Sequence, residues 1–473
     1  MVALRLLISF AAHKKCKLFI AYIDFSKAYD RVPRTRLIEA LLELGCGLVM
    51  LTAIAMMYSN TAIILGLAVI SASYGVRQGS PSSCFLFTLF VNKLIRKLKS
   101  RCEPDGFLGW LHCLMLMDDT VIFATSRDKL VMKLNILMDF CEHSGMIINR
   151  KKTKFMVING TEEDMTPIVL RFIVIENCKK YVYLGSVFTQ DGSIVSSLKE
   201  HCDEKESHLL KFVAFLAKNR DVPFLIKKQV FEAALTSALC YGCEAWFTRD
   251  VSSVRVMYLN AMRELLGVRK TTANDLCLLE LNLPSLEART RGYQKHAISK
   301  LIDSRQGMQD DPFAFVWNLV RDTRTPAVKY ILSVLREEDP VGTDIQKRKE
   351  MLRITTRSKF VTYRSINPDM TLHPVYCDNT NAFKEHERIA FSRMRLSSHS
   401  LRIEMGRWSR TPRELRLCQC GLDIETEEHF LCFCNRFTDK RSALLNINFS
   451  SIKDFFESEP KGVLKFIYSV SEH

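Results

Sequence analysis

Apolar and polar residues alternate in blocks that predict a chain of mixed strands and helices. Residues 17–24, KLFIAYID, form an apolar run rich in β-branched and aromatic residues that ends on Asp24, a pattern typical of a central strand. From 111 to 124, LHCLMLMDDTVIFA, two apolar runs of strand length flank Asp118 and Asp119. This arrangement predicts a hairpin with both aspartates at its tip.

Helical spacing dominates much of the remaining chain. A leucine pattern that opens at Pro33 and stops at Gly45 predicts one helix, and the turn GSP at 79–81 leads into another. The N-terminal segment MVALRLLISFAA carries Arg5 inside its apolar stretch, so we expect a helix that packs on the core and not a signal peptide. Amphipathic segments predict further helices over 202–300.

The composition is that of a globular chain with a basic surface. Its 473 residues are 47% hydrophobic and 25% charged, enough to bury cores in about three domains. The formal charge of +15 favours an anionic partner, either nucleic acid or a membrane surface. No apolar run is long enough to cross a bilayer, and 16 scattered cysteines favour a reducing compartment. We therefore expect a soluble protein that is not secreted.

Two interpretations of the paired aspartates remain open. Aspartate is a common turn residue, so Asp118 and Asp119 fit a solvent-facing turn. A functional site needs a third carboxylate, which Asp24 supplies at the end of the first strand. Carboxylates beside apolar strands are stabilised by a cation, and Mg²⁺ binds carboxylate oxygens together with substrate phosphates. Asp30, a few residues later, fits a helix cap or a partner for an arginine.

A second group of potential ligands lies near the C-terminus. It has the spacing Cys-x-Cys and His-x₄-Cys, formed by Cys418, Cys420, His429 and Cys434. Thiolates and imidazole are the ligands of a structural tetrahedral zinc ion. Cys432 is an alternative to Cys434, and unligated core cysteines are the alternative to zinc. Cys240 and Cys243 lie in an apolar run, which predicts a buried pair without a metal.

Basic residues gather in several places. Five arginines lie within about fifteen residues, with Trp408 among them: Arg402, Arg407, Arg410, Arg413 and Arg416. This group suits phosphate contact with base stacking, and a solvated basic face explains it equally well. Arg263, Arg269 and Lys270 are further candidate phosphate contacts, with an exposed helix end as the alternative.

Five ordered blocks together resemble the reverse transcriptases of non-LTR (LINE-type) retrotransposons. The blocks are YIDFSKAYDRVP at 22–33, GVRQGSP at 75–81, MDDTVIFA at 117–124, GMIINRKKTKFMVI at 145–158 and YLGSVFTQDGS at 183–193. The resemblance implies an α+β fold: a right-hand polymerase palm with a helical thumb, a helical C-terminal connector and a small zinc knuckle. The RQGSP block and the knuckle disfavour an intron maturase or a telomerase relative.

The resemblance also implies domain boundaries. The palm would occupy 1–195 with the fingers largely missing, followed by a thumb at 196–300 and a basic helical connector at 301–410. A CCHC-type zinc knuckle at 411–441 and a C-terminal tail at 442–473 would complete the chain. In the family, fingers and usually an endonuclease precede the block that contains Asp24, so we expect an N-terminally truncated form.

The implied activity is RNA-directed DNA synthesis by two-metal nucleotidyl transfer, for target-primed reverse transcription. By resemblance, Asp24 and Asp118 bridge two Mg²⁺ ions, and Asp119 is the third acidic residue, near the primer end. The implied nucleotide-binding residues are Tyr29, Arg77, Gln78, Gly79 and Lys152.

Individual roles follow from the same resemblance. Tyr29 corresponds to the aromatic residue that blocks a ribose 2′-hydroxyl, with a buried core tyrosine as the alternative. Gln78 matches the residue beside the incoming nucleotide, and Arg77 a template or backbone contact. Lys152 or Lys154 would protonate pyrophosphate, unless both are simply solvated. Residues 183–185, Tyr-Leu-Gly, resemble the hairpin that grips the primer end.

The implied partners are an RNA template, a DNA primer or target and deoxynucleoside triphosphates, without a membrane. The expected location is the nucleus, with the cytoplasm as a second location. Leu116 departs from the family, which usually has tyrosine or phenylalanine there. The alternative function is a catalytically inactive nucleic-acid-binding protein derived from a reverse transcriptase.

Overall fold

The computed structural model describes residues 1–59, 61–65, 68–71, 73–77, 79–171, 173–305, 307–308, 310–445 and 449–471. The chain divides into two compact units. Unit 1 comprises Met1–Ser197, Ala245–Thr248 and Ser299–Leu332, and unit 2 comprises Leu198–Glu244, Arg249–Ile298 and Ser333–His473. None of the helices in these described ranges is long and apolar enough to cross a bilayer.

A six-stranded sheet forms the centre of unit 1. Its strand order is β4 (Cys113–Leu116), β5 (Asp119–Ala124), β1 (Leu18–Ile23), β6 (Lys154–Ile158), β8 (Ile173–Asn177) and β7 (Ile168–Leu170). β1 pairs antiparallel with both β5 and β6 and is buried along its whole length. The strand predicted over 17–24 is therefore confirmed, and it is central in the sheet.

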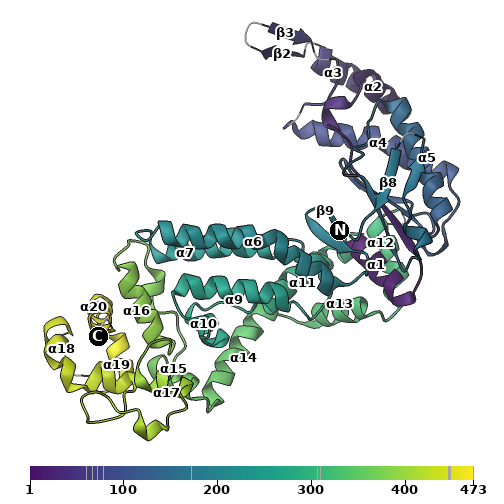
Figure 1. Cartoon of the computed structure of the whole chain (residues 1–473). Coiled ribbons are helices and arrows are strands. Elements are labelled where there is room, and N and C mark those ends of the chain that lie inside the picture. The colour runs from purple at the N-terminus through teal and green to yellow at the C-terminus, as the bar shows by residue number, and fades with distance from the viewer. Residues whose placement is uncertain are drawn as a thin grey trace. The chain divides into compact units, whose positions relative to one another are not determined.

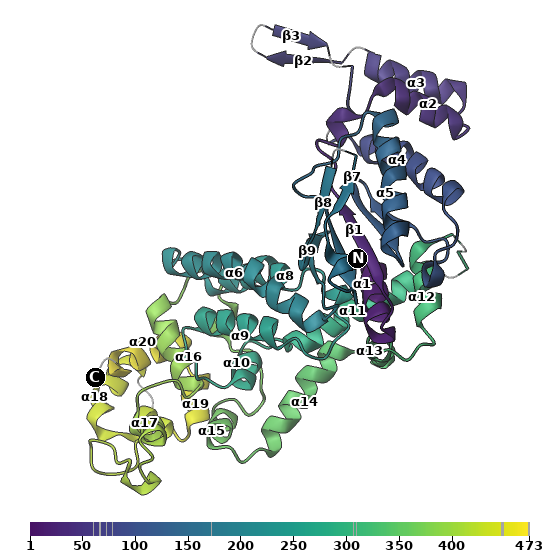
Figure 2. The same ribbon diagram turned by 45° about the vertical axis from the view of Figure 1, so that its right-hand side comes forward.

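The two faces of the sheet are covered differently. On one face, Phe19, Ala21 and Ile23 join a single apolar core with helices α4 (Pro81–Arg101) and α5 (Arg127–Ser144), which Figures 1 and 2 show side by side. Alternate residues of a strand point to opposite faces, so Tyr22 points to the other face. There it stacks on Tyr181 of β9 (Lys180–Tyr183).

Helix α1 (Val2–Lys14) is largely buried and contacts β6. Arg5, 2% exposed, donates hydrogen bonds to the Val187 carbonyl at 2.7 Å and to Ser197 Oγ at 3.2 Å. The expectation of an N-terminal helix packed on the core is thus confirmed.

The remaining elements of unit 1 surround this core. They are η1 (Tyr29–Arg31), α2 (Arg34–Glu43), α3 (Leu48–Ser59), β2 (Ala62–Leu65), β3 (Ala68–Ser71), η2 (Gly106–Leu108), η3 (Glu163–Met165), β10 (Ser186–Thr189) and α12 (Pro312–Val320), with α13 (Pro326–Arg336) at its boundary. The β2–β3 hairpin projects beyond α3 in Figure 1.

The secondary-structure elements found among the described residues of unit 2 are all helices, apart from the isolated bridge between Leu417 and Ile424, which confirms the helical prediction for 202–300. Its elements are α6 (Ile194–Lys218), α7 (Phe224–Val230), η4 (Phe231–Thr236), α8 (Ser237–Leu239), η5 (Cys243–Ala245), α9 (Ser252–Leu266), α10 (Asn274–Glu280), α11 (Leu286–Arg305), α14 (Pro340–Ile354), α15 (Ser358–Ile366), η6 (Pro374–Cys377), α16 (Glu385–Arg395), α17 (Arg402–Trp408), η7 (Arg413–Leu415), η8 (His429–Phe433), η9 (Asn435–Phe437), α18 (Thr438–Leu445), α19 (Ile452–Glu457) and α20 (Pro460–Ser471). Helices α6 and α11 begin or end in unit 1.

The segment that the sequence suggests is only a C-terminal tail, 442–473, takes part in the packing of unit 2. Helix α20 packs against α16, and Val463, Phe466 and Ile467 are fully buried. Figure 1 shows α18, α19 and α20 gathered at the C-terminal end of this unit.

A buried ion pair links helices α10 and α16 of unit 2. Arg395 Nε lies 2.5 Å from Glu280 Oε1, and both side chains are at most 2% exposed. Tyr363 donates to Glu280 at 2.8 Å. Burial opposes ionisation of Glu280, but the Arg395 charge and hydrogen bonds outweigh it, so the pKa of Glu280 is lowered.

Candidate active site

Strands β1 and β5 bring Asp24 and Asp119 opposite each other. Their register pairs Ile23 with Thr120, and one further step places Asp24 across from Asp119. Opposite residues of antiparallel strands have Cα atoms roughly 4.5–5.5 Å apart. The hairpin prediction is confirmed with one correction: Met117 and Asp118 form the turn, and Asp119 already begins β5.

The three carboxylates influence one another through their charge. Burial raises the pKa of Asp119, and the negative charges of Asp118 and Asp24 raise it further, against a smaller opposing effect of Lys152. Like charges gathered in this way disfavour full ionisation. A divalent cation would relieve that repulsion, but the carboxylate oxygens of the three aspartates do not all lie within 4.8 Å of one another in the described part of the chain.

The loop after α5 fixes the backbone of Asp24. The Asn149 N–H donates to the Asp24 carbonyl at 2.8 Å, and the Asp24 N–H donates to Thr153 Oγ1 at 3.2 Å. This loop also carries Lys152, whose Nζ lies 3.8 Å from Asp24 Oδ1. Lys154 instead pairs with Glu176 at 2.5 Å. Of the two candidate lysines, Lys152 is the one beside the carboxylates.

The blocks at 22–33 and 75–81 lie side by side. The Gly75 N–H donates to the Val32 carbonyl at 2.8 Å and the Val76 N–H to the Tyr29 carbonyl at 2.9 Å. Gly75 has a φ of +85°, and a Cβ there would come within 3.1 Å of the Asp30 carbonyl oxygen. Glycine is therefore required at this close approach.

Tyr29 lies close to the turn of the aspartate hairpin. Its ring stacks on Phe87 of α4 at 4.8 Å between centroids. Burial, the Cys84 thiol and the charge of Asp118 together raise the pKa of Tyr29 to about 12. The residue is thus partly a core tyrosine and partly a neighbour of the carboxylates.

Arg77 contacts α3. Its guanidinium donates to the Met57 carbonyl at 2.9 Å and lies 5.8 Å from the Tyr58 ring centroid. Gly79, with a φ of +82°, directly precedes the N-cap of α4 at Ser80. Gln78 lies outside the described residues.

A tyrosine cluster covers the carboxylate end of β1. In the β9–β10 hairpin, Leu184 and Gly185 form the turn with φ values of +50° and +72°. Tyr183 Oη lies 3.5 Å from the Asp119 carbonyl oxygen, and Tyr181 stacks on Tyr22 at 4.2 Å. Burial, then the charges of Asp24 and Asp119, raise the pKa of Tyr181 to about 12.

Sequence reasoning missed Tyr22 and Tyr181 as neighbours of the carboxylates. The signal available was the strand pattern itself. Tyr22 precedes Asp24 by two positions, so it shares a face of the strand with Asp24.

The four C-terminal ligand candidates come together in unit 2. One ligand atom from each of Cys418, Cys420, His429 and Cys434 lies within 4.8 Å of all the others. Among the described residues, three or more such atoms gather this closely only here. Cys432 instead faces the Ser451 carbonyl at 3.7 Å, so the alternative that put Cys432 in place of Cys434 is wrong.

A backbone hydrogen bond favours the thiolate form of Cys420 in this cluster, which is the form that binds a metal. A hydrogen bond from the Leu422 backbone is the largest effect that lowers the pKa of the Cys420 thiol, to about 6. His429 Nε2 lies 3.2 Å from Cys420 Sγ, and His429 Nδ1 lies 4.0 Å from Asp423 Oδ2. A carboxylate behind a ligating histidine is a common arrangement in zinc sites, so the donor set fits zinc.

Three of the five clustered arginines have structural contacts. Arg416 donates to the carbonyls of Thr411 and Ile403, and Arg402 donates to the Leu417 carbonyl at 3.0 Å. Arg407 pairs with Glu404. Arg410 and Arg413 are exposed. Contacts within unit 2 therefore use part of the hydrogen-bonding capacity of three of the five arginines.

Cys240 and Cys243 are 5% and 2% exposed. Burial raises the pKa of the Cys240 thiol to about 12, and the predicted buried pair is confirmed.

Comparison with known proteins agrees with the geometry of unit 1. Residues 3–188 match the family described as "Reverse transcriptase (RNA-dependent DNA polymerase)". The chain is 28% identical over 219 residues to the Retrovirus-related Pol polyprotein from type-1 retrotransposable element R2 of Bradysia coprophila, covering 43% of this chain and 25% of that protein. It is 26% identical over 207 residues to the polyprotein from type-2 retrotransposable element R2DM of Drosophila melanogaster, covering 41% and 20%.

The matched region thus spans a quarter or less of the length of these relatives. Among solved structures, apo telomerase from Candida Tropicalis is 13% identical with a TM-score of 0.30, covering 78% of this chain and 54% of that one. Telomerase from Candida albicans, in complex with a fragment of telomeric RNA, is 15% identical with a TM-score of 0.29, covering 65% and 53%. The family match and the R2 relatives confirm the resemblance to non-LTR retrotransposon reverse transcriptases.

Proposed function

We propose that this chain, which matches the reverse transcriptase family over residues 3–188 and is similar to an R2 retrotransposable element, extends a DNA primer on an RNA template. The observation that carries the proposal is the register of β1 and β5, which sets Asp24 opposite Asp119 beside the Asp118 turn. Mutual repulsion among these carboxylates suits a site for divalent cations.

Each residue of the site then has a task. Asp24 and Asp118 would hold two Mg²⁺ ions, with Asp119 as the third acidic group. When bound, such a metal pair activates the attacking 3′-hydroxyl and stabilises the leaving pyrophosphate. Lys152, beside Asp24, donates a proton to the pyrophosphate oxygen.

Tyr29 and the β9–β10 hairpin select and align the substrates. Tyr29, held against Phe87, blocks the ribose 2′-hydroxyl and so favours deoxynucleotides. Residues 183–185 align the primer end, supported by the contact of Tyr183 with the Asp119 backbone. The family resemblance assigns Gln78, which lies outside the described residues, and Gly79 to the incoming nucleotide. Arg77, which donates a hydrogen bond to the Met57 carbonyl, would act by positioning α3.

The rest of the chain has a binding role in this proposal. The palm is assigned to 1–195, the thumb to 196–300, the basic connector to 301–410 and the knuckle to 411–441. A zinc ion on Cys418, Cys420, His429 and Cys434 would order the knuckle. Target-primed synthesis at a cut chromosomal site would take place in the nucleus.

A primer-extension assay tests the proposal. Purified chain is given an RNA template with an annealed DNA primer, deoxynucleoside triphosphates and Mg²⁺, and the Asp118→Asn variant is the control. We expect extension by the native chain and none by the variant. Template binding without extension, with either Mg²⁺ or Mn²⁺, would overturn the proposal and leave a catalytically inactive nucleic-acid-binding protein.

A further inference from the structure

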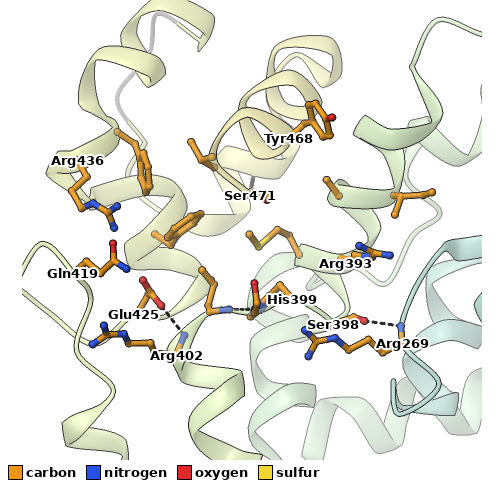
Figure 3. Close-up of a pocket in the computed structure, with 18 of the residues that line it drawn as sticks. Arg269, Arg393, Ser398, His399, Arg402, Gln419, Glu425, Arg436, Tyr468 and Ser471 are labelled. Atoms are coloured by element: carbon orange, nitrogen blue, oxygen red, sulfur yellow. Dashed lines mark hydrogen bonds between the residues drawn. The ribbon is translucent and has the colours of Figure 1, made fainter. Parts of the chain in front are cut away.

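A cavity of about 610 Å³ in unit 2 brings together four arginines from separate segments. Arg269 follows α9, Arg393 lies on α16, Arg402 begins α17 and Arg436 follows the knuckle ligand Cys434. Figure 3 shows Arg402 and Arg436 toward one side of the cavity and Arg269 and Arg393 toward the other. We call it the arginine cavity.

The positive charge of the arginine cavity is not balanced by ion pairs. Arg393 donates to the Gly267 carbonyl at 2.8 Å, Arg402 bonds a backbone carbonyl, and the Arg436 guanidinium lies 5.3 Å from the Phe437 ring. Within the described residues, no ion pair engages Arg269 or these three arginines. Burial and the nearby charge of Arg269 lower the pKa of Arg393.

The acidic group in the lining does not cancel this charge. The Glu425 carboxylate accepts a hydrogen bond from the Arg402 backbone N–H at 2.7 Å, as Figure 3 shows. His399 is paired with Glu427 at 3.0 Å. Four guanidinium groups against one lining carboxylate make the cavity a site for an anion that has more than one charged group.

The lining of the arginine cavity also includes apolar and aromatic side chains. Met394, Phe430, Phe437 and Val470 belong to it and are each at most 5% exposed. The rings of His386 and Tyr468, also in the lining, lie 4.4 Å apart between centroids. A ligand that fits this arrangement carries a flat apolar group together with negative groups.

We propose that the arginine cavity binds a single-stranded polynucleotide, with an unpaired base against its aromatic lining and the flanking phosphates on the arginines. Bases of a duplex are stacked inside the helix, whereas unpaired bases can be splayed out against aromatic side chains. The volume is that of a pocket for one small ligand, so the strand continues over the rim. The inference rests on the proposed function, because copying RNA requires single strands, but it uses none of the palm carboxylates.

Fluorescence anisotropy with the full-length chain and a labelled 12-nucleotide single strand tests the proposal. The test variant is Arg269→Gln with Arg436→Gln, chosen because no hydrogen bond of either side chain is found in the described part of the chain. The matched control is Lys461→Gln with Lys465→Gln, which removes two exposed positive charges outside the cavity. Circular dichroism melting checks that both variants fold.

We expect the cavity variant to bind at least about tenfold more weakly at 0.15 M salt, and the control less than about threefold. The slope of log affinity against log salt should decrease by about 1.4 in the cavity variant, roughly 0.7 for each lost phosphate contact. Equal losses in the two variants, or no loss in the cavity variant, would overturn the proposal.

Competitors define the ligand. RNA and DNA single strands of one sequence should both compete, and the tighter one identifies a template or a target strand as the source. Duplex of that sequence should compete at least about tenfold more weakly. Equal competition by the duplex, or by a mononucleotide at the same concentration, would overturn the assignment to a single strand.

Measuring binding in the Asp118→Asn background, without deoxynucleoside triphosphates, separates the two proposals. Single-strand binding by the native chain without primer extension would contradict the polymerase proposal alone. Primer extension by the native chain, together with an equal single-strand affinity of the native chain and the cavity variant, would contradict this inference alone.

Discussion

Removal of Arg395 should destabilise unit 2 strongly at neutral pH and much less in acid. Arg395→Met leaves the fully buried Glu280 carboxylate without its cation. Breaking a buried ion pair from one side costs about 3–5 kcal/mol. The hydrogen bond from Tyr363 remains but cannot replace a full charge, so we expect a loss within this range at pH 7.5.

The pH dependence follows from the lowered pKa of Glu280 in the native chain. A depressed carboxyl pKa contributes stability above its unfolded value of about 4.5, and this contribution is lost as the pH falls. In Arg395→Met, burial should outweigh the remaining hydrogen bonds from Tyr363 and Tyr376 and raise the pKa of Glu280. Protonation of Glu280 in mild acid should then restore part of the lost stability. The difference between native and variant should therefore shrink between pH 7.5 and pH 5.

Urea-dependent hydrogen exchange of peptides from α10 and α16 measures this difference within unit 2. The double variant Glu280→Gln with Arg395→Met is the control, because it removes both charges and should cost less than Arg395→Met alone. A loss below about 1 kcal/mol, or one of equal size at both pH values, would refute the reasoning.

Three further predictions concern the proposed sites. The native chain should bind one equivalent of zinc, which Cys434→Ser should lose and Cys432→Ser should retain; a metal assay by mass spectrometry checks this, and equal retention by both variants would exclude Cys434 as a ligand. Tyr29→Ala should increase ribonucleotide incorporation relative to deoxynucleotide incorporation by at least about tenfold (about 1.4 kcal/mol), measured by single-nucleotide extension; an unchanged ratio would leave Tyr29 as a core residue only. Carboxyl titration by NMR should find the pKa of Asp119 above its ordinary value in the native chain. In Asp24→Asn the pKa of Asp119 should be lower than in the native chain, because one of the like charges that raise it is gone; an unchanged value would mean that the two groups do not interact.

Local patterns predicted the elements that carry the carboxylates. The apolar run ending at Asp24 and the paired runs around Asp118 became β1 and the β4–β5 hairpin, because strand periodicity and turn chemistry are local properties. The pairing of β1 with β5 is a long-range choice, and neither strand alone encodes it. The family resemblance supplied that information.

Side-chain partners were less accessible to sequence reasoning. The cluster around Trp408 suggested arginines without contacts inside the protein, yet the guanidinium groups of Arg416 and Arg402 donate hydrogen bonds to backbone carbonyls. A pattern of charges does not say which guanidinium groups satisfy buried acceptors. The arginine cavity shows the reverse case, since Arg269 and Arg436 are far apart in sequence and line the same cavity only in the folded chain.

The measurement that tests the central claim most directly is primer extension by Asp24→Asn beside Asp128→Asn. Asp24 ends β1 opposite Asp119, whereas Asp128 is an exposed carboxylate in the first turn of α5. Loss of a metal-binding carboxylate forfeits several kcal/mol of transition-state stabilisation, so Asp24→Asn should reduce the extension rate by about a thousandfold or more. Asp128→Asn should retain the native rate. Equal rates for Asp24→Asn and Asp128→Asn would contradict the assignment of this site as a polymerase centre.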